Sequence, residues 1–301
     1  MPELPDIELY LHALESRVCD RPLNGLRLKS PFLLRTVRPK PQDAIGHKVR
    51  TLQRIGKRIA IGFDNELWFV LHLMIAGRLH WKDPGAKIGA KTDLCAFDFP
   101  DGSLVLTEAG SKKRAALHVV EGEEALAALD PGGIDVLSCS FDVFKRALTE
   151  TNHTVKRSLT DPRIFSGIGN AYSDEILFRA RLSPVLQTQK MSEDDIGTLL
   201  EATQATLSEW IDLLCKETGE QFPRKVTAFR KEMMVHGRYK EACHVCGNPV
   251  QRIRYAANET NYCAHCQNGG KLLADRSLSR LLKKDWPKSL YELEEMSLKP
   301  G

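Results

Sequence analysis

Apolar residues recur along the chain in two different rhythms. Near the beginning they repeat at the three- and four-residue spacing of an amphipathic helix, and Asp6 is a suitable N-cap for that helix. Between about residues 49 and 106 they gather instead into short runs typical of strands, separated by turn residues. The helical positions are Ile7, Tyr10, Leu11, Leu14 and Val18, and the strand-like runs are 49–55, 58–63, 67–73, 93–99 and 103–106. This pattern predicts one helix followed by an antiparallel β-sandwich or barrel.

The pattern becomes helical again beyond the proline- and glycine-containing stretch at residues 130–133, which we interpret as a domain boundary. Farther along, Ser192 and Asp195 have the spacing of a capping box, which predicts the start of a long amphipathic helix. Gly219 is placed to end that helix. The sequence therefore predicts a helical domain after the β-rich one.

A glycine-containing turn lies between these helical segments. Gly167 and Gly169 can form a tight turn, and we expect Asn170 to cap the helix that follows. Amides at such a helix start are free to bind a phosphate. A simple helix–helix turn has the same composition, so this motif alone does not decide between a structural and a binding role.

Eight cysteines occur, and half of them are paired closely along the chain. Cys243 and Cys246 form one Cys-x2-Cys pair, and Cys263 and Cys266 form another. The matched spacing within one short segment favours a tetrathiolate zinc site over two chance pairs or a redox dithiol. Residues 250–255 alternate like a strand, so we expect a small β-hairpin whose folding energy comes from the metal. The remaining cysteines are Cys19, Cys95, Cys139 and Cys215, which we interpret as buried free thiols.

The composition is that of a globular protein, with 42% hydrophobic and 27% charged residues. A formal net charge of +4 permits a polyanionic partner without requiring one. No apolar run approaches the roughly 18 residues that a membrane-spanning helix needs. The chain begins with acidic residues and prolines rather than with the basic and then apolar segments of a secretory signal. We therefore expect a cytoplasmic or nuclear-type protein.

The first three residues carry candidate chemistry. Met1 precedes a small proline, so removal of the initiator methionine would expose Pro2 as the amino terminus. A terminal amine has a pKa near about 8, which leaves a usable uncharged fraction at neutral pH. Such an amine can attack an aldehyde-like carbon to form an iminium, and Glu3 is close enough to act as an acid or base. On these residues alone, an ordinary terminus with prolines at a helix start explains the pattern equally well.

Five motifs occur in a fixed order, and together they resemble the formamidopyrimidine-DNA glycosylase / endonuclease VIII family of base-excision repair enzymes. The similarity extends over roughly residues 2–266. The motifs are Pro2-Glu3-Leu4-Pro5-Asp6-Ile7-Glu8, Gly56-Lys57-Arg58, His72-Leu73 followed by Gly77 and Leu79, Gly167-Ile168-Gly169-Asn170 followed by Asp174-Glu175, and the four paired cysteines.

The resemblance implies an α+β multidomain fold. Its parts are an N-terminal helix with an antiparallel β-sandwich at residues 1–130, a helix–two-turns–helix domain at 131–222 and a β-hairpin zinc finger at 223–270. Residues 271–301 continue beyond the usual end of the family, and their leucines and interleaved basic residues predict a helical C-terminal extension. The implied cofactor is one structural Zn²⁺ per chain, and the implied partner is double-stranded DNA with a damaged base or an abasic site. The protein is expected to be a monomer.

Residue roles follow from the same resemblance. Pro2 is expected to attack the sugar C1′, Glu3 to transfer protons, and Lys57 to contact the phosphate beside the lesion. The other matched positions, expected to bind DNA, are His72, Ile75, Asn170 and Asn258.

Three departures from the family pattern stand out. Ile75 occupies the place of a methionine that fills the space left by the flipped base, and a branched apolar side chain can still wedge between bases. The stretch 107–114 lacks the arginine and phenylalanine that contact the opposite strand in the oxidised-purine enzymes. Asn258 stands where the family has a phosphate-clamping arginine, and Arg252 or Arg254 could supply that charge from the preceding strand.

These features indicate a DNA glycosylase and AP lyase that removes a damaged base through a Schiff base on Pro2. The strand would then be cleaved by β-elimination, followed by δ-elimination if the geometry allows it. The alternative is a DNA-damage-binding protein that recognises abasic or unusual lesions with little turnover. The altered loop and Asn258 favour the alternative, whereas the pair Pro2 and Glu3 favours the enzyme, because a pure binding protein has no use for them.

Overall fold

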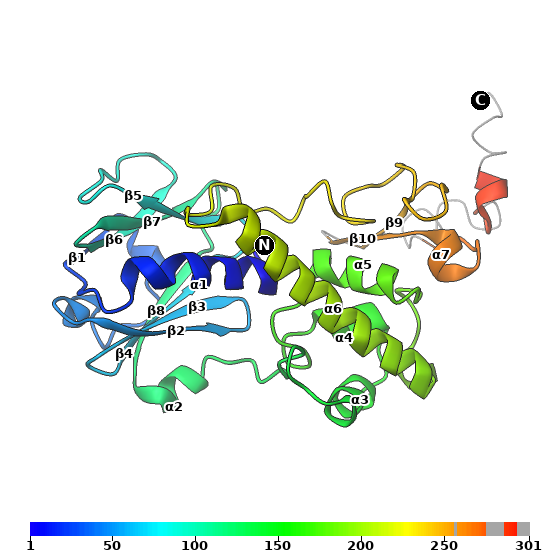
Figure 1. The fold of residues 1–301 in the computed structure, drawn as a ribbon, viewed down its shortest axis with the longest axis horizontal. Helices are drawn as coiled ribbons and strands as arrows, with labels where there is room; N and C mark the ends of the chain where they lie inside the picture. Colours follow the sequence, from blue (N-terminus) through cyan, green and yellow to red (C-terminus); the bar gives the residue numbers. More distant parts are fainter. Residues whose placement is uncertain (256–257, 275–285, 294–301) are drawn as a thin grey trace. The chain divides into compact units, whose positions relative to one another are not determined.

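The computed structural model describes residues 1–255, 258–274 and 286–293, and the side chains of residues 255 and 258 lie outside the described part. The chain forms two compact units (Figure 1). The first comprises Met1–Gly133 and Ser208–Ala228, and the second comprises Ile134–Leu207 and the residues from Phe229 onward. Among the described residues, none of the helices combines the length and apolar character needed to cross a bilayer.

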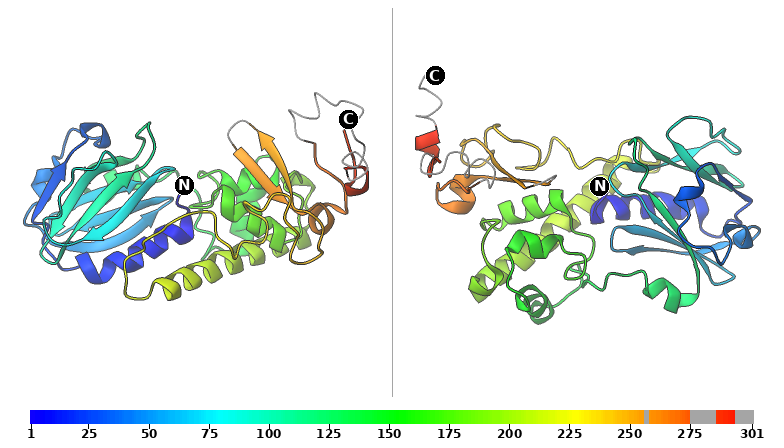
Figure 2. Two further views of the ribbon diagram at one scale, coloured as in Figure 1. Left: turned by 90° about the horizontal axis from the view of Figure 1, so that it is seen from above. Right: turned by 180° about the vertical axis from the view of Figure 1, so that it is seen from behind.

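The first unit is a sandwich of two four-stranded antiparallel sheets, as the strand pattern predicts (Figure 2). Its core lies between the sheets, where the ring centroids of Phe69 and Phe97, from opposite sheets, are 5.8 Å apart. One sheet has the order β1 (Gly25–Leu28), β6 (Asp93–Phe99), β7 (Gly102–Glu108), β5 (Gly77–Lys82), and the other has the order β2 (Val49–Ile55), β3 (Arg58–Phe63), β4 (Leu67–His72), β8 (Ala116–Glu121). The unit also contains α2 (Gly122–Ala127) and the 3-10 turns η1 (Pro31–Leu33) and η2 (Pro41–Ala44).

Helix α1 (Leu4–Val18) packs on β2 and β3 through a fully buried apolar face. An ion pair between Arg54 of β2 and Glu8 of α1, with 2.7 Å between Nε and Oε1, joins the same elements. Asp6 is not the N-cap that the sequence predicts. The helix begins earlier because Pro5 is tolerated in the first turn, where its missing N–H costs nothing. Glu3 is the N-cap, and its N–H donates to Oδ2 of Asp6 at 3.0 Å.

The second unit is mainly helical. The predicted capping box is confirmed, because the N–H of Ser192 donates to Oδ2 of Asp195 at 2.9 Å and the N–H of Asp195 donates to the Ser192 hydroxyl at 3.1 Å. Helix α6 ends at Thr218, and Gly219 follows with φ of 55°. The helices are α3 (Phe141–Thr149), α4 (Val155–Thr160), α5 (Asn170–Arg179), α7 (Ala264–Asn268) and the part of α6 (Glu193–Thr218) up to Leu207, with the 3-10 turn η3 (Thr188–Lys190).

The predicted hairpin is also present, as β9 (Gln251–Tyr255) paired antiparallel with β10 (Asn258–Tyr262). In the tail, the N–H of Leu272 donates to the carbonyl of Lys288 at 2.9 Å, and the N–H of Leu273 donates to the Tyr262 hydroxyl at 2.8 Å. The tail is thus attached to the hairpin in its described part. Most of the predicted helical extension falls on residues 275–285 and 294–301, which lie outside the described residues, so it stays a prediction.

Candidate active site and metal centre

The amino terminus and the first turn of α1 form a charged, largely buried group in the first unit. Pro2 and Glu3 are buried, with Glu3 only 4% exposed, whereas Met1 is 38% exposed. The pKa of the Met1 amine is lowered by burial and, to a smaller extent, by the charges of Arg78 and Lys57, while Glu3 and Asp6 oppose this shift. Two carboxylates and two cations therefore surround the nitrogen.

Lys57 belongs to this group because it occupies the turn between β2 and β3. Gly56 beside it has φ of 59°, which glycine adopts readily and which allows the strands to reverse direction here. Burial lowers the pKa of Lys57, and the nearby charge of Glu3 raises it. The structure thus brings Pro2, Glu3 and Lys57, three positions singled out in the sequence, into one electrostatic environment.

His72 ends β4 and pairs in register with Arg58 of β3. Burial, and after it the charges of Arg58, Lys57 and His118, lower the pKa of His72 to about 4. In the free protein the imidazole is therefore neutral at physiological pH. A neutral imidazole can still donate one N–H to an anion.

This pKa predicts a pH dependence of folding stability. Because the unfolded chain binds a proton near pH 6.5 and the folded chain only near pH 4, stability rises with pH between these values and is lost as the pH falls through them. The size of this contribution is up to about 3 kcal/mol. Urea unfolding at pH 7.0 and pH 4.5 measures it, with His72→Gln as the comparison. The free energy of unfolding should fall less for the variant than for the wild type, and equal losses would contradict the assignment.

Ile75 lies at the tip of a tight turn between β4 and β5. The N–H of Gly77 donates to the carbonyl of Leu73 at 2.9 Å, and a Cβ at position 77 would lie 2.2 Å from that carbonyl oxygen, so only glycine fits. Met74 has φ of 53° and is half-buried, whereas Ile75 is 61% exposed. Of the two apolar residues, Ile75 is therefore the one that projects.

A second loop lies beside this turn, since a Cβ at Gly110 would be 3.9 Å from that of Ala76. The carboxylate of Glu108 closes this loop by accepting the N–H of Arg114 at 2.8 Å and of Ala115 at 3.2 Å. The stretch that differs from the family pattern is thus a compact loop next to the Ile75 turn.

In the second unit, Asn170 is the first residue of α5 rather than its cap, which is Gly169. Gly167, with φ of 82°, supplies the turn, and the chain already has helical geometry when it reaches the asparagine. The side chain of Asn170 is therefore free of a capping role. Its Nδ2 donates to the carbonyl of Glu259 in β10 at 2.7 Å. Asn170 thus connects the glycine turn to the zinc-finger hairpin.

Two carboxylates of α5 were quoted in the sequence motif without a role. Asp174, which is 1% exposed, accepts hydrogen bonds from Nζ of Lys156 at 2.5 Å, Nδ1 of His236 at 2.8 Å and the N–H of Asn261 at 3.2 Å. Together these contacts hold the helix, the segment before the hairpin and β10 in one arrangement.

Glu175 accepts the backbone N–H groups of Met234, Val235 and His236 at 2.7 to 2.9 Å. Burial raises the pKa of Glu175. The sequence signal that could have found these residues is two adjacent acids within an otherwise apolar helical run.

The backbone of Asn258 begins β10 opposite Tyr255, and its side chain is outside the described part. Both arginines considered as substitutes pair with Glu259, Arg252 at 3.4 Å and Arg254 at 2.9 Å. The Arg252 guanidinium also lies 4.0 Å from the ring centroid of Tyr239. A phosphate at this place would have to compete with the Glu259 carboxylate.

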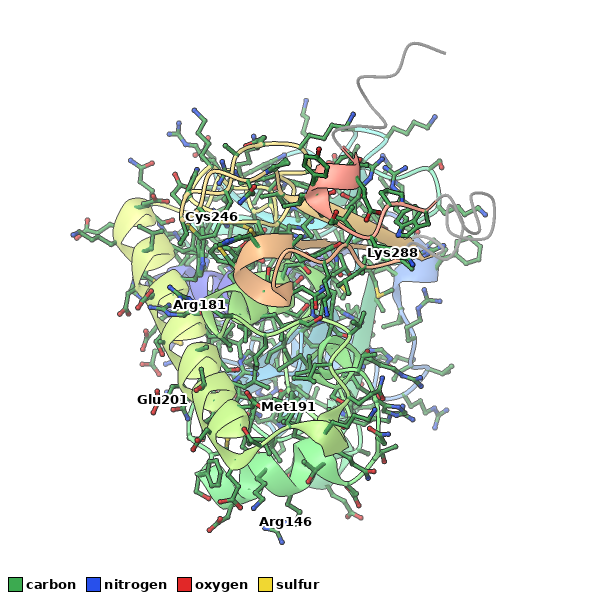
Figure 3. All side chains as sticks on the ribbon, turned by 90° about the vertical axis from the view of Figure 1, so that its right-hand side faces the viewer. Arg146, Arg181, Met191, Glu201, Cys246 and Lys288 are labelled. Carbon is green, nitrogen blue, oxygen red and sulfur yellow. The ribbon has the colours of Figure 1, made fainter. Side chains whose placement is uncertain are left out.

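The four paired cysteines form a metal site. Their sulfur atoms all lie within 4.8 Å of one another, with 3.4 Å between Cys246 and Cys263 and 4.0 Å between Cys243 and Cys266. Tetrahedral zinc with Zn–S bonds of about 2.3 Å places its sulfurs about 3.8 Å apart, so the residues fit this ion. Figure 3 labels Cys246, which lies near α7, the helix that carries Cys266. The predicted zinc site is confirmed.

The interpretation of the remaining cysteines is only partly right. Cys95 is buried, whereas Cys19, Cys139 and Cys215 are partly exposed, and all of them are free thiols. Apolar neighbours along the sequence suggest burial, but the exposure of a thiol depends on tertiary packing, which the sequence does not display.

Comparisons with known proteins agree with this architecture. Family models described as the formamidopyrimidine-DNA glycosylase N-terminal domain, the formamidopyrimidine-DNA glycosylase H2TH domain and a zinc finger found in FPG and IleRS match residues 1–112, 133–220 and 240–269. The formamidopyrimidine-DNA glycosylase of Geobacillus kaustophilus is 31% identical over 279 residues, covering 89% of this chain and all of the relative. That of Laribacter hongkongensis is 29% identical over 273 residues, with the same coverage.

Solved structures show the same fold. Lactococcus lactis Fpg bound non-covalently to DNA with an AP site has a TM-score of 0.77 at 23% identity, covering 88% of this chain and 99% of that one. The wild-type Lactococcus lactis protein with DNA containing N7-benzyl-Fapy-dG has a TM-score of 0.78 at 22% identity, covering 89% of this chain and all of that one. The three matched domains and the full-length relatives show that the chain belongs to the formamidopyrimidine-DNA glycosylase family.

Proposed function

We propose that the protein is a DNA glycosylase and AP lyase of base-excision repair, acting as a monomer on damaged double-stranded DNA in the cytoplasm. Membership of the family supports the glycosylase. The observation that carries the chemistry is the buried terminus, where Pro2 and Glu3 are buried and where burial and the charges of Arg78 and Lys57 lower the pKa of the adjoining Met1 amine. With Met1 removed, Pro2 supplies an amine in this environment that is uncharged more often than an exposed one.

The reaction begins when the Pro2 nitrogen attacks the sugar C1′. The bond from C1′ to the base breaks, the base leaves with the bonding electrons and a proton, and the nitrogen loses its own hydrogen to a nearby base. Glu3 transfers these protons, and it also protonates the ring oxygen as the sugar opens. The product is an iminium, which stays cationic because a proline nitrogen retains no hydrogen to lose.

Strand cleavage follows from the charge of the iminium. The cationic nitrogen acidifies the C2′ hydrogen, whose removal expels the 3′ phosphate with its electron pair in a β-elimination. Removal of a further proton can expel the 5′ phosphate in a δ-elimination. Lys57 is proposed to hold the phosphate beside the reacting sugar.

The substrate base must leave the duplex before Pro2 can reach the sugar. Apolar side chains that enter a base stack help this by replacing the stacking of the flipped base. Ile75 is 61% exposed at the tip of its rigid turn, which suits this role. His72, Asn170 and Asn258 are proposed to contact the DNA backbone, with Asn170 using the part of its amide not bound to Glu259.

Lys57→Gln is expected to reduce the slope of log affinity against log salt by about one, because one phosphate contact is lost. Fluorescence anisotropy on a duplex with a reduced abasic site, at 50 to 300 mM salt, measures this slope. Lys48→Gln is the matched control, since Lys48 is an exposed lysine of the same unit. An unchanged slope for Lys57→Gln, or equal changes in both variants, would contradict the proposed contact.

The alternative, a DNA-damage-binding protein with little turnover, is favoured by Asn258 in place of a charged residue and by the closed loop at Glu108. Borohydride trapping on a duplex with one abasic site distinguishes the two functions. A covalent protein–DNA adduct supports the enzyme, whereas tight binding without an adduct supports the binding protein. A panel of duplexes, each with a single oxidised or ring-opened base, then identifies the lesion and the elimination products.

A further inference from the structure

Glu259 of β10 holds two arginines of the neighbouring strand β9. Its Oε2 lies 2.9 Å from Nε of Arg254 and 3.4 Å from Nη1 of Arg252. Its Oε1 accepts a hydrogen bond from Nδ2 of Asn261 at 3.1 Å. In the antiparallel register each arginine stands directly opposite one of these two β10 residues, so the four side chains share one face of the hairpin. Both oxygens of the carboxylate are therefore occupied.

Two of these three donors are themselves fixed. Asn261 is 2% exposed, its N–H donates to Oδ2 of Asp174 at 3.2 Å, and its Oδ1 accepts the N–H of Gly237 at 2.8 Å. The guanidinium of Arg252 lies 4.0 Å from the ring centroid of Tyr239, within the range of a cation–π contact. The surrounding structure thus determines where the carboxylate oxygens lie.

Arg254 forms the outer side of this group. Its side chain is 58% exposed, against 30% for those of Arg252 and Glu259. Burial by itself would raise the pKa of Glu259, but hydrogen bonds from Arg254 and Asn261 and the charges of the arginines lower it. The carboxylate is therefore charged at neutral pH, and it partly neutralises an arginine that is open to solvent.

The donors that hold this carboxylate are also suited to a phosphate. Guanidinium groups bind both anions through charge-assisted hydrogen bonds. The backbone carbonyl of Glu259 accepts a hydrogen bond from Nδ2 of Asn170 at 2.7 Å, so a residue proposed to contact the DNA backbone lies at the same place. A phosphate bound by Arg254 would thus replace the Glu259 carboxylate rather than add to it.

We propose that Glu259 is a positioning residue for DNA binding, whose carboxylate stands in for a phosphate: it orders Arg254 in the DNA-free protein and is displaced when a DNA phosphate binds. The proposal deepens the proposed function and rests on it. Exchange of one anion for another leaves the number of ion pairs on Arg254 unchanged, so part of the affinity of the phosphate contact is lost. A merely structural glutamate would support the hairpin without competing with DNA.

Glu259→Gln is expected to bind a duplex with one reduced abasic site about threefold more tightly than the wild type, because an exposed charge pair no longer has to be broken. The slope of log affinity against log salt should become steeper by up to about one, since a phosphate then replaces a counterion instead of the carboxylate. Fluorescence anisotropy over a range of salt concentrations measures both quantities. An undamaged duplex should show the same ratio of affinities, because phosphate contacts carry no sequence information.

Glu241→Gln is the matched control, because Glu241 is a carboxylate of the same unit whose Oε2 lies 2.8 Å from Nε of Arg238. Arg254→Gln should bind DNA more weakly. Adding Glu259→Gln to it should restore less affinity than Glu259→Gln gains alone, since the contact that the carboxylate blocks is missing. Glu259→Ala serves as a second variant, and circular dichroism and zinc content select the one that folds. Both substitutions keep the backbone carbonyl that Asn170 binds.

Unchanged or weaker DNA binding by the folded Glu259 variant would overturn the proposal, as would an equal gain in Glu241→Gln or an undiminished gain without Arg254. Modification of Arg254 by phenylglyoxal, followed by mass spectrometry, tests the contact without DNA. Its rate should rise about threefold in the variant, and an unchanged rate would contradict the proposal. If the wild type forms no borohydride adduct with abasic-site DNA, the proposed function fails, while the affinities and the modification rate still decide the role of Glu259.

Discussion

Inserting one alanine between Met1 and Pro2 is expected to reduce covalent trapping on abasic-site DNA by about a thousandfold or more. The insertion turns the proline nitrogen into a peptide amide, which is not a nucleophile, and moves the free amine by one Cα spacing, about 3.8 Å. A misplacement of only about 1 Å can already cost 100-fold in rate. The rate of adduct formation under borohydride, with enzyme in excess over DNA, measures the effect.

Pro2→Ala is the matched control for this insertion. It keeps a free amine at the same position next to Glu3, so it should retain measurable trapping, although its primary amine is no longer a ring nitrogen. Mass spectrometry must confirm that Met1 has been removed from each variant. If the extended protein traps DNA as fast as the wild type, the nucleophile is another amine, and Lys57, which has a lowered pKa near Glu3, becomes the first candidate.

Local sequence patterns were sufficient to predict most helices and strands of this fold, because the formation of each element depends mainly on residues that are close in sequence. The strands alternate with turn residues, and the capping box at Ser192 needs only the residue three positions later. The two N-caps that were placed wrongly, at Asp6 and Asn170, are displaced by three residues and by one residue. The observed N-caps are Glu3 and Gly169, and the backbone geometry that selects them is not displayed in the sequence.

Contacts distant in sequence could not be predicted in this way. Arg78 looks like an ordinary polar residue of a strand, yet its carbonyl partner at Val226 lies 148 residues away. Asp174 lies in a helix that the sequence predicts, but its partners His236 and Asn261 are 62 and 87 residues farther along. Such partners follow from the tertiary fold. The family motif contained Asp174, whereas Arg78 became apparent only through its contacts.

The stability of the zinc finger also depends on contacts between residues that are distant in sequence. The apolar cluster around the metal site is small, and two of the ligands, Cys243 and Cys263, belong to it, while the other two, Cys246 and Cys266, pack against it. Phe178 of α5, Val235 and Val250 pack against Cys243 and Cys263. So little apolar surface cannot hold the hairpin in place by itself. Structural zinc in isolated fingers contributes about 10–16 kcal/mol of apparent binding energy, which is then available for folding.

Cys246→Ser is therefore expected to lower the zinc affinity by more than about 100-fold and to unfold the hairpin. Loss of β10 would remove the hydrogen bonds from Asn261 to Asp174 and from Asn170 to Glu259, so the loss should weaken the contact surface of α5 as well. Zinc content, limited proteolysis between residues 240 and 269, and affinity for abasic-site DNA are measured on the same preparation. The wild type should contain one zinc per chain.

Cys19→Ser is the matched control, because Cys19 is a free, partly exposed thiol of the first unit. It should keep its zinc, its resistance to proteolysis and its DNA affinity. Treating the wild type with a strong chelator should reproduce the Cys246→Ser result, and adding zinc should reverse it, because the sandwich of the first unit has its own core and does not depend on the metal. A Cys246→Ser protein that retains stoichiometric zinc and wild-type protection would show that three thiolates suffice, and that the hairpin is stabilised mainly by its contacts with α5.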